Sequence, residues 1–280
     1  MLERLADGIQ ELIVLAALFT ELSLLARGMT SLRTSWRNSL AEWRVNLIYY
    51  FSDLILLVPV LTSMSGGIDS FMAGHGLKGL AADEIASLPT WAVLILAVAV
   101  SDLIAYWVHR VMHISWLWPV HAAHHSDRAA NWLTLIRFHP LNRFIAVGLS
   151  ALVFVPLGFP VWSVVASNWI RHFYGYFIHA NVGWRFGPLR YVLVSPHLHR
   201  WHHSSDAVAF DRNFASVFAL YDVIFGTFYS PKHEAGALGV SDPAYPGTWW
   251  GQTLYPFRVW VRALQGAVWR DRGRSGVPAE

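Results

Sequence analysis

The chain has 280 residues, of which 55% are hydrophobic, 15% aromatic and only 14% charged, and its formal net charge is +3. Soluble globular domains carry about 25% charged residues, so this composition argues against a cytosolic globule, a disordered chain and a nucleic-acid-binding protein. The absence of cysteine excludes disulfides, iron–sulfur clusters, thiolate nucleophiles and cysteine-ligated zinc. We expect a single membrane-embedded domain, residues 1–280, that is all-α.

Three apolar segments occupy residues 1–101 and a few positions beyond. Leu12–Ala26 is interrupted by Glu21 and is marginal as a span, whereas Val45–Met64 and Leu88–Val108 are long enough. A helix needs about 20 apolar residues to cross a bilayer. The N-terminal residues lack the basic region and cleavage site of a removable signal peptide.

Charge asymmetry predicts which side of the membrane each loop occupies. Residues 27–44 carry four arginines, whereas residues 66–87 carry one lysine and three acidic residues. The positive-inside rule places the first loop in the cytoplasm and the second outside. The third span therefore ends on the cytoplasmic side, at His109.

The next apolar stretch, Phe144–Ile170, is broken by Pro156–Pro160. Its first arm is too short to cross about 30 Å of hydrocarbon, so we expect a hairpin that dips in and returns. From Gly183 onward a more polar cytoplasmic helical cap is expected, and residues 230–280 form a cytoplasmic or interfacial tail. Within that tail, Phe257–Trp269 is equally consistent with an interfacial amphipathic helix and a plain surface helix.

Histidine is concentrated in one part of the chain, because twelve of the 14 histidines lie between positions 109 and 203. Three clusters stand out: His109 and His113; His121, His124 and His125; and His199, His202 and His203. Residues at i and i+4 share a helix face, so His109 and His113 can reach one point, and each triplet offers three rings. Eight imidazoles suit iron or zinc and are too many for one ion, so two metal ions are implied.

These residues resemble the fatty acid hydroxylase and sterol desaturase superfamily of integral-membrane diiron enzymes. The resemblance covers Asp102 to Tyr229, and it follows the order and spacing of three histidine boxes, HX3–4H, HX2–3HH and HX2–3HH. The matching sequences are Tyr106–His113, Leu117–Ser126, Arg137–Pro140, Phe177–Asn181, Pro196–His203, Asn213–Ala215, Tyr221–Asp222 and Phe225–Phe228.

The resemblance implies that residues 102–229 are the catalytic region and that the box histidines hold the metals. The implied ligands are His109, His113, His121, His124, His125, His199, His202 and His203, with His179 as a ninth. Lipid hydroxylases of the family can carry a further histidine four residues before that ninth one, where this chain has Gly175, which leaves the full ligand count open.

Residues that orient the ligands through their second ring nitrogen are also expected. Asp102 lies on the face of His109, and Asp222 follows the last box; either is equally consistent with a buried residue that does not touch a ligand. His139 is equally consistent with a place beside the metals and with a structural role. His172 and His197 are weaker candidates, and His75 and His233 are expected at the surface.

The resemblance implies two iron ions and O2 as cofactors, with zinc as a possible substitute. The implied partners are a lipid substrate and a separate electron carrier, ferredoxin- or cytochrome b5-like. The segment Gly74–Gly79 spells GxGxxG but follows a membrane span rather than a strand, so no nucleotide cofactor is expected. Arg110, Arg128, Arg200 and Arg212 are either a docking surface or positive-inside anchors.

We therefore expect an O2-dependent lipid hydroxylase, monooxygenase or desaturase in a bacterial inner membrane, with its metals on the cytoplasmic side. A membrane metal-binding or metal-transport protein with a histidine relay is the alternative from another class. A third possibility, an inactive family member, is opposed by the intact boxes. Hydrolysis by zinc fits poorly, because zinc sites use about three or four ligands.

Overall fold

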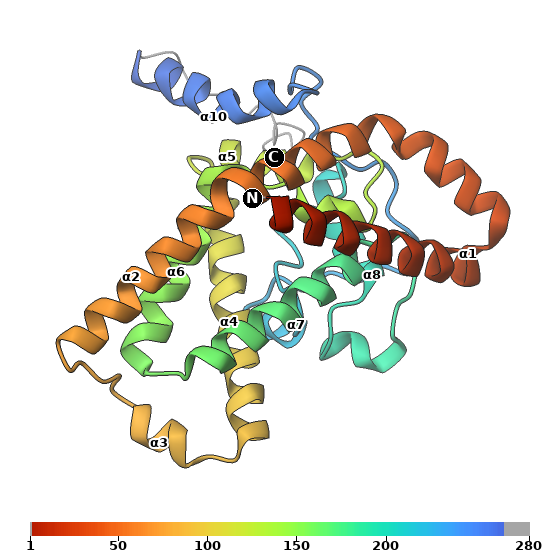
Figure 1. Cartoon of the computed structure of the whole chain (residues 1–280). Helices are drawn as coiled ribbons and strands as arrows, with labels where there is room; N and C mark the ends of the chain where they lie inside the picture. Colours follow the sequence, from red (N-terminus) through yellow and green to blue (C-terminus); the bar gives the residue numbers. More distant parts are fainter. Residues whose placement is uncertain (1, 266–280) are drawn as a thin grey trace.

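The structure, a computed structural model, describes residues 2–265 and is built from helices, with no strand in that range. The principal helices in chain order are α1 (Leu2–Ser52), α2 (Val58–Gly74), α3 (Ala82–Ser87), α4 (Thr90–Met112), α5 (Trp118–His125), α6 (Pro140–Leu157), α7 (Val161–His179), α8 (Pro196–His202), α9 (Leu220–Ile224) and α10 (Trp249–Leu264). The π-helical segment η1 (Asp53–Leu57) joins α1 to α2, and three short 3₁₀ helices lie between other elements: η2 (Trp132–Ile136), η3 (Gly187–Tyr191) and η4 (Ala207–Ala209). The all-α expectation is confirmed for the described residues (Figure 1).

Four stretches are long and apolar enough to cross a membrane: Leu2–Thr30, Ser39–Gly74, Thr90–Met112 and Pro140–Leu157. The marginal first segment is therefore long enough after all, because the helix extends well beyond the apolar run predicted from Leu12 to Ala26. The prediction of a loop over residues 27–44 is wrong. This stretch is helical, and the direction of the chain changes at Gly28, whose φ of 75° lies in the left-handed region that favours glycine.

The predicted hairpin is present as α6 and α7. Pro140 begins α6 four residues before the predicted arm, so the helix has 18 residues and is long enough to cross a membrane; the expectation of an arm too short to cross is wrong. Gly158 ends the helix with φ 80°. Pro160 precedes α7, which runs back to His179. The ends of α4 and α7 and the beginning of α6 therefore lie at one end of the bundle, with the α6–α7 turn at the other (Figure 1).

The α6–α7 turn is held by the loop that follows α2. Backbone amides of Leu80 and Ala81 donate hydrogen bonds to the carbonyls of Pro156 and Leu157. Gly79 lies against Gly158 so closely that a Cβ on Gly79 would be 2.1 Å from the Gly158 Cα. The last glycine of the GxGxxG segment thus permits a backbone contact, and no strand precedes it.

The C-terminal helix α10 begins eight residues before the predicted Phe257, and the part of that prediction beyond 265 lies outside the described residues. Its exposed apolar side chains are Trp250, Leu254, Phe257, Val261 and Leu264. These positions recur every three or four residues and form one stripe along the helix. Figure 1 shows α10 across the end of the bundle, beside α5.

Two buried clusters connect the bundle to the histidine-rich segments. Leu15, Phe19 and Tyr50 of α1 pack with Trp132 of η2 and Tyr176 of α7. A second cluster joins α4 and α7 to α8 and the segment after it; it consists of Tyr106, Ile178, Val194, Leu198, Phe214, Ala215 and Ala219. The boxes are therefore mounted on elements that are packed together rather than on free loops.

Candidate metal centre

The nine histidines singled out from the sequence converge on one region in two neighbouring groups. The first group is His109, His113, His121, His125 and His202, and the second is His124, His179, His199 and His203. Within each group, the candidate ligand nitrogens all lie within 4.8 Å of one another. The groups adjoin, because the rings of His125 and His203 stack with centroids 4.6 Å apart.

Each histidine doublet divides between the two groups. Successive residues of an α-helix point about 100° apart, so His124 and His125 face different groups, as do His202 and His203. Each triplet therefore contributes rings to both groups. The i,i+4 members stay together, while the remaining ring of each triplet crosses to the other group.

Short helices present the second and third boxes. Pro119 stands in the first turn of α5, where its missing N–H would have no helical partner. Ser195 caps α8 by accepting a hydrogen bond from the Leu198 amide at 3.3 Å, and Pro196 begins that helix. Proline and a capping serine start a helix at a defined residue, which determines the face on which each imidazole emerges.

The second ring nitrogen is held by backbone carbonyls in three ligand candidates. The Nδ1 atoms of His109, His179 and His202 lie 2.7 Å from the carbonyl oxygens of Phe214, Gly175 and Arg212, respectively. Donation from Nδ1–H leaves the Nε2 lone pair for a metal. A carbonyl carries no residue-type signal, so sequence reasoning had no means of finding these partners.

In two other ligand candidates, a side chain lies beside the second ring nitrogen. Oδ1 of Asn142 accepts from Nδ1 of His121 at 2.8 Å, and Asp211 lies 3.3 Å from Nδ1 of His113. Both residues were missed in the sequence. The only signal was the position of Asn142 just after the His139–Pro140 pair, which places it in the first turn of α6.

Whether a metal ion fits this site can be judged from the buried ring nitrogens that have no hydrogen-bond partner. The Nε2 atoms of His109, His121, His125 and His202 are buried and have no hydrogen-bond partner among the described residues. In the second group, Nε2 of His179 lies 2.9 Å from that of His199 and 3.3 Å from that of His124. Such convergence of lone-pair atoms is costly in a protein interior unless a cation or a proton lies between them. The donor set therefore fits metal ions bound by imidazole.

Burial keeps these rings neutral, which is the form that binds a metal. Desolvation holds the pKa of His121, His124, His125, His199, His202 and His203 well below its usual value, and neighbouring histidines lower it further.

The two carboxylates considered as partners of the ligands bind backbone amides of the segment after the last box instead of a histidine ring. Asp102 accepts hydrogen bonds from the backbone amides of Val217 and Phe218, and Arg171 lies 3.5 Å from it. It therefore anchors the segment after the last box rather than an imidazole.

Asp222 accepts from the backbone amide of Phe214, whose carbonyl in turn accepts from His109. Burial raises the pKa of Asp222 to about 6, and the Thr227 hydroxyl with two backbone amides opposes that shift. Neither Asp102 nor Asp222 hydrogen-bonds to any of the nine rings in the structure described.

The remaining histidines lie outside both groups. His139 caps α6 by accepting from the Leu141 amide, and its Nε2 lies 2.9 Å from the Thr253 carbonyl of α10, so both ring nitrogens are engaged in structure. His197 contacts the Pro231 carbonyl through Nε2. His172 lies 3.6 Å from Glu11, and His75 and His233 are exposed, as expected.

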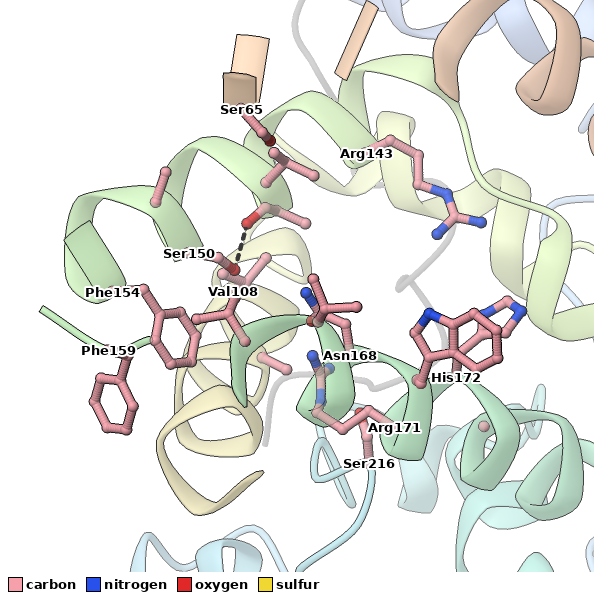
Figure 2. A pocket seen from close by; sticks show the side chains of 18 of the residues that line it. Ser65, Val108, Arg143, Ser150, Phe154, Phe159, Asn168, Arg171, His172 and Ser216 are labelled. Atoms are coloured by element: carbon pink, nitrogen blue, oxygen red, sulfur yellow. Dashed lines mark hydrogen bonds between the residues drawn. The ribbon is translucent and has the colours of Figure 1, made fainter. Parts of the chain in front are cut away.

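A cavity of about 1410 Å³ reaches the metal centre from within the bundle. His109, His121, His124, His179 and His199 line one end of it. Residues of α1, α2, α3, α4, α6 and α7 also line it, and Figure 2 shows Arg143 and His172 at one side of the cavity with Phe154 and Phe159 at the other. The cavity thus links the two histidine groups to a largely apolar space between helices.

Comparison with known proteins gives consistent matches. Residues 94–227 match the family model described as fatty acid hydroxylase. Alkylglycerol monooxygenase of Xenopus tropicalis is 29% identical over 81% of this chain and 55% of its own length. Ornithine lipid hydroxylase of Rhizobium tropici is 29% identical over 59% of this chain and 50% of its own length. Human alkylglycerol monooxygenase is 31% identical over 55% of this chain and 34% of its own length.

The chain spans about half the length of the curated relatives it matches first. No solved structure matches it significantly. The family match covers all three histidine boxes, the segments that carry the two histidine groups. The chain therefore resembles the fatty acid hydroxylase family over residues 94–227, the part that carries the histidine boxes.

Proposed function

We propose that this protein is a membrane-bound diiron oxidoreductase that uses O2 to oxidise a C–H bond of a membrane lipid. The observation that carries this proposal is the pair of adjoining histidine groups at one end of a largely apolar cavity. The names of the relatives, which include lipid monooxygenases and a lipid hydroxylase, support the same class of reaction.

The nine histidines would hold two iron ions, and zinc would be a substitute without redox chemistry. Bound ferrous iron supplies the chemistry of O2 reduction, in which hydroxylation puts one oxygen atom into the C–H bond and releases the other as water, at the expense of two electrons and two protons. Desaturation instead removes two hydrogens from the lipid and forms two waters with the same external electrons and protons.

The chain's own residues would hold the metal ions, orient the imidazole rings and exclude water from the site. Backbone carbonyls hold Nδ1 of His109, His179 and His202, and Asn142 holds Nδ1 of His121, so these four rings present Nε2. Met112 and Ile178 are buried beside the histidines and line the cavity, so they exclude water from its inner end. No nucleophile or general base from the chain is required.

The electrons would come from a separate carrier, ferredoxin- or cytochrome b5-like, as the resemblance to diiron enzymes implies. Of the four arginines considered for docking, Arg128 and Arg212 are exposed, whereas Arg110 and Arg200 are partly buried and donate to carbonyls of Phe225 and Ala130. We place the metal end on the cytoplasmic side of a bacterial inner membrane, in keeping with the arginines of residues 27–44.

A metal-transport function receives less support. Transport needs ligands distributed through the depth of the bilayer. Here the nine histidines form two adjoining groups, and the ends of α6 and α7 that meet at the α6–α7 turn contribute none of them.

The decisive experiment uses the full chain purified in detergent and loaded with iron. We expect two iron ions per chain, O2 consumption that depends on a reduced carrier and a lipid, and one atom of ¹⁸O in the product if the reaction is hydroxylation. A product lighter by two hydrogen atoms would identify a desaturase. Iron uptake without any lipid product, from a panel of extracted membrane lipids, would overturn the proposal.

A further inference from the structure

Glu11 carries a carboxylate within the first apolar helix, Leu2–Thr30. The Tyr50 hydroxyl donates to it at 2.9 Å, the Tyr176 hydroxyl lies at 3.5 Å, and Nε2 of His172 lies at 3.6 Å. An ionisable group within a membrane helix is costly and is by default a candidate for function. Glu11 also lies outside residues 94–227, so the family match assigns it nothing.

Glu11 and His172 both line the cavity that reaches the metal centre. Their side chains are 35% and 36% exposed, so neither is closed off by its protein partners. A carboxylate has about four acceptor positions, and the two tyrosines occupy only part of them. The pair therefore has capacity for a donor group that enters the cavity.

The other charges inside the cavity are already compensated. Arg143 pairs with Asp53 at 3.1 Å, and Arg171 lies 3.5 Å from Asp102. Arg4 and Asp7 also line the cavity; both are exposed, and their charges are opposite in sign. The carboxylate of Glu11 would thus repel an anionic headgroup, and both interior arginines are already paired with carboxylates. A hydroxyl or ammonium group could instead donate a hydrogen bond to the Glu11 carboxylate.

The spacing along α7 relates this pair to the metal end. His172 precedes His179 by seven residues of one helix, which corresponds to about 10 Å along the axis. An extended chain advances about 1.2 Å per bond, so roughly eight bonds span this distance. In the opposite direction the cavity continues along apolar residues to Phe154 and Phe159 (Figure 2).

We propose that Glu11 and His172 form a headgroup subsite for a lipid whose polar group donates hydrogen bonds, either a hydroxyl or an ammonium group. This proposal rests on the proposed lipid oxidation and deepens it. A lipid held there presents to the metal centre a carbon within about eight bonds of its polar group, and the end of a long chain is not oxidised.

Binding to the metal-free protein tests the subsite apart from catalysis. The probes are a radiolabelled long-chain monoalkylglycerol, the same molecule with both hydroxyls methylated, and the corresponding alkyl phosphate. We expect the monoalkylglycerol to bind about tenfold more tightly than either of the others. The methylated molecule has no hydrogen-bond donor, and the alkyl phosphate carries a negative charge that Glu11 repels. Equal affinities, or tightest binding of the phosphate, would overturn the subsite.

Two variants locate the effect. Glu11→Leu should abolish the preference for the monoalkylglycerol, and His172→Phe, which leaves the Glu11–Tyr50 contact in place, should reduce it. Glu21→Gln changes an exposed acid of the same helix that does not line the cavity, so it should bind like the unaltered chain. An unchanged preference in a folded His172→Phe protein contradicts the assignment even if Glu11→Leu fails to fold.

Product mapping with the iron-loaded protein separates the two proposals. Oxidation within about eight bonds of the headgroup supports the subsite, and oxidation near the terminal methyl group overturns it while leaving lipid oxidation intact. If no lipid is oxidised at all, the proposed function fails, and the binding preference of the metal-free protein still decides the subsite.

Discussion

Asn142, in the first turn of α6, accepts a hydrogen bond through Oδ1 from Nδ1 of His121 at 2.8 Å, and both side chains are buried. This contact joins the membrane hairpin to the second histidine box. It also determines the tautomer of His121, since a ring that donates from Nδ1 presents the lone pair of Nε2.

Asn142→Leu should therefore weaken metal binding at the first histidine group. Loss of such an orienting partner typically costs 10–100-fold in metal affinity, so we expect a decrease of about that size. Asn142→Asp keeps the acceptor oxygen and should retain most of the affinity. Titration of the metal-bound protein with a competing chelator measures this, and equal affinity for the Leu and Asp variants would contradict the role assigned to Asn142.

The division of the histidines predicts selective loss of metal. His202→Gln, in the first group, and His199→Gln, in the second, should each lower the iron content toward one ion per chain, because each removes a ligand from a different group. Elemental analysis of the purified protein gives the stoichiometry. His75→Gln alters an exposed histidine and should leave the content unchanged. Retention of two ions in both box variants would argue against the assigned groups.

Arg137 is a buried cation that ties α1 to the segment after the second box. Its side chain is 1% exposed, and it donates to Glu42 at 2.7 Å, to Asn46 at 2.6 Å and to Ser126 at 3.0 Å. Arg137→Met leaves these partners buried or partly buried without their donor, which should lower the free energy of unfolding by about 3–5 kcal/mol.

Thermal unfolding in detergent measures this loss as a lower melting temperature. Arg258→Met, on the exposed side of α10, is the matched control and should change the melting temperature little. Similar effects of the two substitutions would mean that the Arg137 network contributes no more than a surface charge.

The contact between Gly79 and Gly158 makes the far end of the hairpin sensitive to a single methyl group. In Gly79→Ala the new Cβ would lie 2.1 Å from the Gly158 Cα, so backbone must move, and we expect a loss of about 1–3 kcal/mol. Gly67→Ala adds the same atom where nothing lies within 4 Å. The melting temperature should fall for the first variant and not for the second.

Acid should destabilise the metal-free protein. The pKa of six buried histidines, among them His124 and His203, lies well below 6.5 when the chain is folded and near 6.5 when it is unfolded. Below about pH 6.5 the unfolded state therefore binds more protons than the folded state. The contribution of these neutral rings to the free energy of unfolding is fully present above that pH. It falls as the pH decreases, by up to about 1.4 kcal/mol per pH unit for each histidine.

Chemical unfolding of the metal-free protein at pH 7.5 and pH 5.5 checks this dependence. Metal ions compete with protons for the same nitrogens, so the iron-loaded protein should lose its metal over the same acidic range. A free energy of unfolding that is constant, or that rises on acidification, would show that these rings are not buried in the neutral form.

Several features followed from residue type and local spacing. Apolar length predicted three spans, and Pro156–Pro160 predicted the hairpin that returns His179 to the other histidines. Local spacing singled out the eight histidines of the three clusters, because i,i+4 spacing is a property of one helix, and the family resemblance added His179. These are short-range relationships, and the sequence states them directly.

Tertiary packing decided the rest. Which ring of each doublet joins which group depends on how α4, α5, α7 and α8 are placed relative to one another, and the orienting carbonyls of Phe214 and Gly175 depend on backbone direction. The meeting of Glu11 with His172 joins helices that are distant in the sequence. Spacing along one helix contains no information about the angle and distance between helices, so only the folded chain could bring these groups together.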